Sequence, residues 1–108
     1  MEKITRKKFI ELIKKGEHVF CGSVNSDKFT EEDTKKLLTD NRDRIAKMIT
    51  ENKTRTVIKE QSNGLQFTGG SWITFQAGDT YFQENNVLVA RCNDGYFTMV
   101  YGLKGITL

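Results

Sequence analysis

The sequence predicts a single α+β domain in which two helices, separated by a short strand, precede an antiparallel β-meander. In the first half of the chain, apolar residues recur at helical spacing, whereas from Thr54 onward their period changes to two. The later strands are joined by short turn signals, and no helical crossover that parallel pairing would need lies between them. The length of 108 residues fits one domain, so we expect residues 1–108 to fold together.

The first helix is expected over residues 6–15. Thr5 is a suitable N-cap, because its hydroxyl can accept a hydrogen bond from a free N–H of the first turn. The apolar stripe of this helix consists of Phe9, Ile10, Leu12 and Ile13. Gly16 is expected to end the helix in a left-handed conformation. A short strand over residues 17–24 and a turn at residues 25–28 should follow.

A second, longer helix is expected over residues 31–51, with Thr30 as its cap. Its apolar residues at helical spacing are Leu37, Leu38, Ile45, Met48 and Ile49. The opposite side is charged, which indicates a helix that lies on a surface rather than one that is buried. Residues 54–103 then predict a meander of about five strands, with tight turns at Asn63–Gly64 and Asp94–Gly95.

Positive charge is concentrated at the start of the chain. The net charge is +3, and residues 1–15 hold +4, from six basic side chains against two acidic ones. An asymmetric charge distribution of this kind indicates an interaction surface. The candidate partner-binding residues are this basic set and the acidic first turn of the second helix: Lys3, Arg6, Lys7, Lys8, Lys14, Lys15, Glu31, Glu32 and Asp33.

His18, Cys21 and Cys92 are the candidate metal ligands, and Zn²⁺ is the ion that such ligands would suit. Residues three apart on a regular strand point to opposite faces, so His18 and Cys21 converge only if the segment turns or bulges at Gly22. Without such a bulge, Cys21 is expected in the core and His18 at the surface or its boundary. No other cofactor is expected.

We expect no enzyme. A Cys92–His18 dyad is geometrically conceivable, but nucleophilic catalysis needs a base and an orienting group, and no flanking sequence supports one. The acidic residues cluster in the second helix, where helix capping and solvation already explain them. Gly69-Gly70-Ser71 lacks the following lysine and helix of a phosphate-binding loop.

Nucleic-acid binding is the alternative to protein binding. The basic residues could neutralise phosphates, and eight aromatic residues could stack on bases. These are Phe67, Trp72, Phe75, Tyr81, Phe82, Tyr96, Phe97 and Tyr101. However, residues 54–108 carry four charges of each sign, whereas a base-stacking face usually has interleaved lysine or arginine. An amphipathic helix of mixed charge and a meander with exposed edges suit a protein interface.

The chain contains no apolar leader and no apolar run approaching the roughly 20 residues that cross a bilayer. We therefore expect a cytoplasmic protein without a membrane partner. Nothing in the sequence indicates an oligomeric state.

Three stretches of the chain are distinctive when taken together: ITRKKFIEL at Ile4–Leu12, RTVIKEQSNGLQF at Arg55–Phe67, and GSWITF at Gly70–Phe75 with the later Tyr81. Their arrangement resembles small accessory proteins of phages and mobile elements of Gram-positive bacteria, among them type II-A anti-CRISPR proteins. The resemblance implies an inhibitor that occupies a surface of a Cas9–guide complex and blocks target-DNA loading or cleavage. It carries over no site residues. Several such inhibitors imitate DNA with acidic surfaces, whereas this chain is basic, so docking on a protein lobe is the expected mode.

Overall fold

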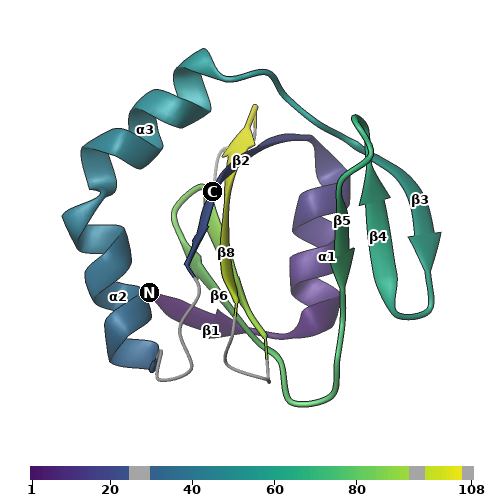
Figure 1. Cartoon of the computed structure of the whole chain (residues 1–108), viewed down its shortest axis with the longest axis horizontal. Helices are drawn as coiled ribbons and strands as arrows, with labels where there is room; N and C mark the ends of the chain where they lie inside the picture. Colours follow the sequence, from purple (N-terminus) through teal and green to yellow (C-terminus); the bar gives the residue numbers. More distant parts are fainter. Residues whose placement is uncertain (25–29, 93–96, 106–108) are drawn as a thin grey trace.

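A computed structural model describes residues 1–24, 30–92 and 97–105 of the chain (Figure 1). These residues form three helices and eight strands. The helices are α1 (Arg6–Lys15), α2 (Glu31–Asp40) and α3 (Arg42–Glu51). The strands are β1 (Glu2–Ile4), β2 (Glu17–Val24), β3 (Val57–Gln61), β4 (Gly64–Phe67), β5 (Trp72–Thr74), β6 (Thr80–Glu84), β7 (Val87–Arg91) and β8 (Thr98–Lys104). None of the described helices is both long enough and apolar enough to cross a membrane.

The strands form two antiparallel sheets, which confirms the α+β class. The large sheet has the order β1-β6-β7-β8-β2, and the small sheet has the order β3-β4-β5. The predicted meander is therefore present only in part. Consecutive strands pair as expected within β3–β5 and within β6–β8, but the chain changes sheets between β5 and β6. The large sheet is completed by β1 and β2, which precede α2 in the sequence.

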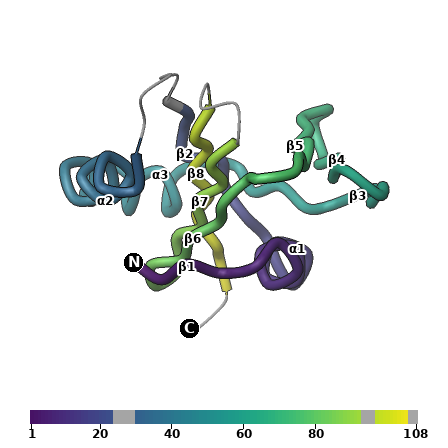
Figure 2. The backbone as a smooth tube through the Cα atoms, turned by 90° about the horizontal axis from the view of Figure 1, so that it is seen from below, coloured from purple at the N-terminus to yellow at the C-terminus, as the bar shows by residue number. Residues whose placement is uncertain are grey.

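The large sheet is the middle layer of the molecule. The helices α2 and α3 cover one of its faces, and α1 together with the small sheet covers the other (Figure 2). The core under α2 and α3 contains Val19, Cys21, Leu38, Ile45, Phe82, Val89 and Val100. The core on the α1 side contains Phe9, Leu12, Ile13, Leu65, Phe67, Ile73, Phe75, Tyr81, Leu88, Ala90, Tyr101 and Leu103. Both faces of the large sheet are thus buried, by α2 and α3 on one side and by α1 and the small sheet on the other.

The first helix has the predicted bounds and the predicted N-cap. The hydroxyl of Thr5 accepts a hydrogen bond from the backbone N–H of Lys8 at 3.1 Å. The prediction of a left-handed Gly16 is wrong, because its backbone is extended, with φ −158° and ψ −166°. Extended backbone leads directly from α1 into β2, which begins at Glu17, so no left-handed residue is needed there.

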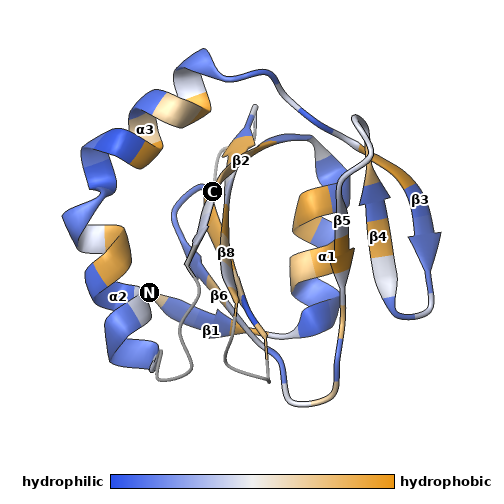
Figure 3. Cartoon of the chain, in the orientation of Figure 1, coloured by the Kyte–Doolittle hydropathy of each residue, from blue (hydrophilic) through white to orange (hydrophobic). Residues whose placement is uncertain are grey.

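The predicted helix over residues 31–51 is interrupted at Asn41. The side-chain amide of Asn41 donates to the carbonyl of Leu37 at 2.9 Å, and its ψ of 17° departs from helical geometry. Asparagine favours such local side-chain hydrogen bonds, which compete with the helix. Thr30 and Asp33 form the capping box at the start of α2, so the predicted cap is confirmed. In Figure 3 the apolar bands of α2 and α3 face the large sheet.

The hairpin between β3 and β4 is one residue earlier than predicted. Gln61 pairs with Gly64, so Ser62 and Asn63 form the turn and Gly64 already belongs to the strand. A side chain at Gly64 would place a Cβ 2.8 Å from the carbonyl oxygen of Ile73, so glycine is required here by the close approach of β5. The predicted turns at 25–28 and 94–95 lie outside the described residues.

A second glycine positions α3. Gly102 of β8 faces this helix, and a Cβ at Gly102 would overlap the side chain of Ile49 and lie 3.3 Å from the Sγ of Cys21. The absence of a side chain at Gly102 therefore allows α3 to pack directly on the large sheet.

Candidate interaction surface on the first helix

The helix α1 divides into a buried side and a solvent-exposed basic side. Phe9, Leu12 and Ile13 are at most 3% exposed and anchor the helix in the core. The opposite side carries the α1 basic face, which we define as Lys7, Lys8, Lys14 and Lys15, all of them exposed. The four side chains thus project from a rigid element, because apolar contacts fix the helix behind them.

Three of these four lysines have no ion-pair partner in the part of the chain that the structure describes. Lys14 is paired with Glu60 of β3, with 2.5 Å between Nζ and Oε2. Lys7, Lys8 and Lys15 make no ion pair with any residue in the described ranges 1–24, 30–92 and 97–105. Their charge is therefore available to an anionic partner.

A groove of about 700 Å³ lies over the α1 basic face. It is lined by residues of α1 and by Glu60, which reaches it from β3. Ile10 and Leu12 give the groove an apolar component, and the four lysines lie around it. Sequence reasoning did not find Glu60, because it is 46 residues from Lys14 and no local pattern connects the two.

The side chain of Arg6 makes contacts within the fold, so we do not include it in the α1 basic face. Its Nη2 donates to the carbonyl oxygen of Gln76 at 2.5 Å, and its guanidinium carbon lies 5.3 Å from the centre of the Phe75 ring. These contacts tie the start of α1 to the segment after β5. Burial, partly offset by the hydrogen bond and charge of Arg6, raises the pKa of the neighbouring Tyr81 to about 12.

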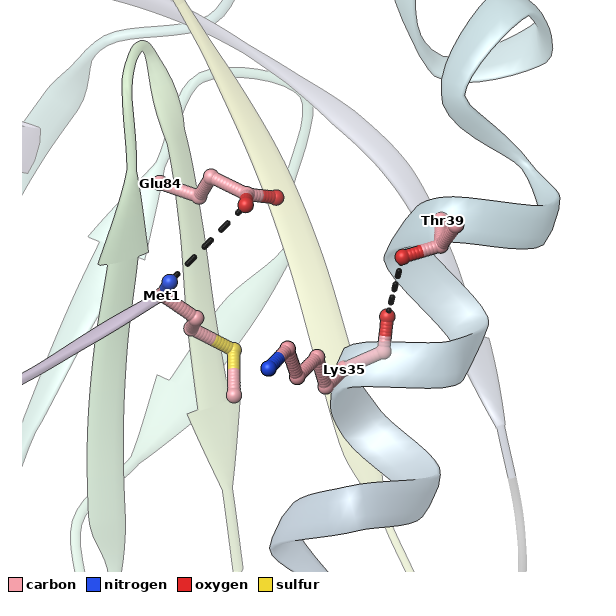
Figure 4. A network of polar contacts seen from close by, with 4 residues as sticks. All are labelled: Met1, Lys35, Thr39 and Glu84. Carbon is pink, nitrogen blue, oxygen red and sulfur yellow. Dashed lines mark hydrogen bonds and ion pairs between the residues drawn. The ribbon is translucent and has the colours of Figure 1, made fainter.

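Lys3 lies apart from the other predicted basic residues. It pairs with Phe82 of β6, and directly opposed residues of antiparallel strands point to the same face of the sheet. The Phe82 side chain belongs to the core under α2 and α3, so Lys3 is on that face and α1 is on the other. On the same side of the molecule, the N-terminal amine lies 3.8 Å from the Glu84 carboxylate. Figure 4 shows that the Lys35 side chain of α2 extends toward Met1.

The predicted acidic residues Glu31, Glu32 and Asp33 are exposed at the start of α2. The large sheet separates them from the α1 basic face, so the two predicted sets do not form one site (Figure 2). Hydrogen bonds from the backbone N–H and the hydroxyl of Thr30, both 2.8 Å long, hold the pKa of Asp33 below its usual range. Asp33 is therefore engaged in the capping box at the start of α2.

His18 and Cys21 lie on opposite sides of the large sheet. The His18 ring is 4.7 Å from the ring of Phe67 on the α1 side, whereas Cys21 packs in the core under α2 and α3. The strand does bulge between Phe20 and Gly22, but the side chains still alternate between the two faces from His18 to Cys21, so these two residues do not converge. Within the described ranges, no three histidine, cysteine or acidic residues are grouped so that they could hold a metal ion. The third candidate ligand, Cys92, is half-buried and directly follows Arg91, the last residue of β7.

The expectation that His18 lies at the surface or its boundary is wrong. Its side chain is fully buried, and neither ring nitrogen has a hydrogen-bond partner among the described residues. His18 is covered because its backbone pairs with Arg55, in bonds of 2.9 and 2.7 Å, which brings the small sheet over it. Burial, with the charge of Arg55, lowers the pKa of His18 from 6.5 to about 4.

Most of the aromatic residues considered for base stacking are in the core. Phe67, Phe75, Tyr81, Phe82 and Tyr101 are at most 5% exposed, so their rings cannot receive a base. Trp72 is 50% exposed on β5, and Phe97 is 46% exposed before β8. Neither lines the groove over α1. Tyr96 lies outside the described residues.

Comparisons of the chain with protein-family models, with curated proteins and with solved structures found no match.

Proposed function

We propose that this chain is a non-enzymatic binding protein that docks on a protein partner through the α1 basic face. The observation that carries the proposal is a set of three exposed lysines, Lys7, Lys8 and Lys15, on a helix anchored by its buried side; none of them forms an ion pair with a described residue. Charges arranged on a rigid element steer association and orient a partner. The groove beside them adds apolar contact area, which charged residues alone do not provide.

The environments of His18 and Cys21 argue against a role in catalysis. A general base must reach the proton that it removes, and the His18 ring is enclosed by Phe67, Tyr101 and the rest of the core. Burial raises the pKa of Cys21, which keeps its sulfur in the poorly nucleophilic thiol form. These two environments support a role in binding, through contact and charge, rather than in catalysis.

The sequence resemblance to type II-A anti-CRISPR proteins names the first partner to test. We propose that the chain acts in the bacterial cytoplasm, binds a Cas9–guide complex and blocks the loading or cleavage of target DNA. The α1 basic face suits an acidic patch on a protein lobe. It does not suit wholesale imitation of DNA, for which a continuous acidic surface is needed.

Nucleic-acid binding is the second candidate, and the same three exposed lysines favour it, because they could neutralise phosphates. It is the weaker candidate for two reasons. The α1 groove contains Glu11 and Glu60, which repel phosphate, and it lacks an exposed aromatic side chain for stacking.

A retention experiment tests the proposal. The tagged protein is immobilised at moderate salt and exposed to a Cas9–guide complex, and in a parallel experiment to free duplex and single-stranded DNA. We expect retention of the Cas9–guide complex and little retention of DNA. Loss of the Cas9 signal would refute the assignment of the partner. Tight DNA binding that weakens steeply with salt would establish the second candidate instead.

A further inference from the structure

The groove over α1 contains one contact that an approaching partner must change. Lys14 projects from α1 near Ile10 and Lys7, which are four and seven residues away along the helix and therefore on nearly the same side. Its ammonium group is held by Glu60, which reaches the groove from β3. Glu60 is the acidic residue that the small sheet contributes to the groove lining.

The Lys14–Glu60 pair is easily exchanged. The side chains are 45% and 44% exposed, so water screens the pair and it contributes little to folding. An acidic segment that presents carboxylates to both Lys7 and Lys14, about two helical turns apart, gains from two positive charges, whereas Glu60 contacts one. Such a segment can displace Glu60 at low cost.

We propose that Glu60 occupies the place of a partner carboxylate on Lys14, and that the groove receives an acidic protein segment with an apolar side chain over Ile10. The inference rests on the proposed function, because it takes the α1 basic face as the docking surface. The charge complementarity is direct, since lysines surround a half-buried Ile10. A nucleic acid fits this groove less well, because its continuous phosphates would meet both Glu60 and Glu11 and would leave Ile10 without an apolar contact.

Under this proposal, Glu60 also limits affinity. While it holds Lys14, the partner must compete with it, and after displacement its negative charge remains beside the bound acidic segment. Neutralising Glu60 therefore removes both the competitor and the repulsion. A Glu60 that only stabilises the local fold would have no such effect on binding.

Fluorescence anisotropy with labelled probes tests this directly. The probes are a peptide of alternating glutamate and leucine, an all-glutamate peptide of the same charge, and a single-stranded oligonucleotide of the same charge. Each is titrated with the wild-type chain, Glu60→Gln and Glu51→Gln. Glu51 is an exposed acid at the end of α3, so Glu51→Gln matches the change in net charge away from the groove.

We expect the glutamate–leucine peptide to bind more tightly than the other two probes. Glu60→Gln should tighten its binding about two- to fivefold beyond the effect of Glu51→Gln, the range of an exposed charge pair. Equal affinities for the two variants would overturn the proposal, as would weaker binding by Glu60→Gln or a preference for the oligonucleotide. If Cas9 is not retained but the Glu60→Gln effect appears, the partner assignment fails and this inference stands. If Cas9 is retained while Glu60→Gln and Glu51→Gln bind the peptide equally, the proposed function stands and this inference fails.

Discussion

The buried His18 makes a quantitative prediction about stability at acidic pH. Its ring lies against Phe67 and Tyr101, without hydrogen bonds from the described residues, and Arg55 is the nearby positive charge that opposes its protonation. The pKa is lowered from 6.5 to about 4 in the folded state. As pH falls, the unfolded chain therefore takes up the proton first, and the free energy of unfolding decreases.

The size of this decrease follows from the two pKa values. Stability from His18 is fully present above pH 6.5 and is lost between there and about pH 4. The loss amounts to about 2 kcal/mol at pH 5 and approaches about 3 kcal/mol below pH 4, since each unit of pKa corresponds to about 1.4 kcal/mol. His18 is the only histidine of the chain, so no second imidazole contributes.

Urea unfolding followed by far-UV circular dichroism at pH 7.5 and pH 5 measures the loss. The control is His18→Leu, which removes both the ionisable ring and the two unpaired nitrogens. We expect the wild type to lose about 2 kcal/mol between the two pH values and the variant to lose much less. Equal losses in both proteins would assign the effect to carboxylates, and a wild type unchanged at pH 5 would refute the buried, neutral His18.

Three further predictions concern packing and capping. Gly102→Ala should destabilise the fold by about 1–3 kcal/mol through overlap with Ile49, and adding Ile49→Ala should remove the clash, so unfolding of the double variant tests the cause. Thr30→Ala should cost about 1 kcal/mol by removing the capping box with Asp33, and a loss below a few tenths in urea unfolding would contradict that role. Phe9→Ala should cost about 3–5 kcal/mol because Phe9 is fully buried, and a thermal midpoint near that of the wild type would be inconsistent with this.

Features that depend on neighbouring residues were foreseeable from the sequence. The bounds of α1 and the caps at Thr5 and Thr30 follow from interactions within one helical turn. The alternation of apolar residues indicated most of the strands. Short elements with few apolar residues were missed, as in β1, whose three residues include only Ile4 as an apolar side chain.

Features that depend on distant contacts could not be predicted in the same way. No local signal shows that β1 and β2 join β6 and β8 in one sheet, or that the meander divides between β5 and β6. The burial of His18 depends on its pairing with Arg55, 37 positions later (55 − 18).

The candidate site was predicted in part. The exposed positions of Lys7, Lys8, Lys14 and Lys15 agree with a helix whose other side is apolar. Charge counting alone could not separate these lysines from Lys3, because the face on which Lys3 lies is set by the register of β1 against β6.

The central claim is that the α1 basic face binds the partner, and one titration tests it most directly. The affinity for a Cas9–guide complex is measured for the wild type, for Lys7→Gln/Lys8→Gln/Lys15→Gln, and for Lys36→Gln/Lys47→Gln/Lys53→Gln. The second triple variant removes the same charge from exposed lysines that lie outside α1. We predict a loss of about tenfold or more for the α1 variant, from roughly 0.5 kcal/mol or more per lysine, with a smaller loss for the control variant. Equal losses in the two variants would contradict the claim.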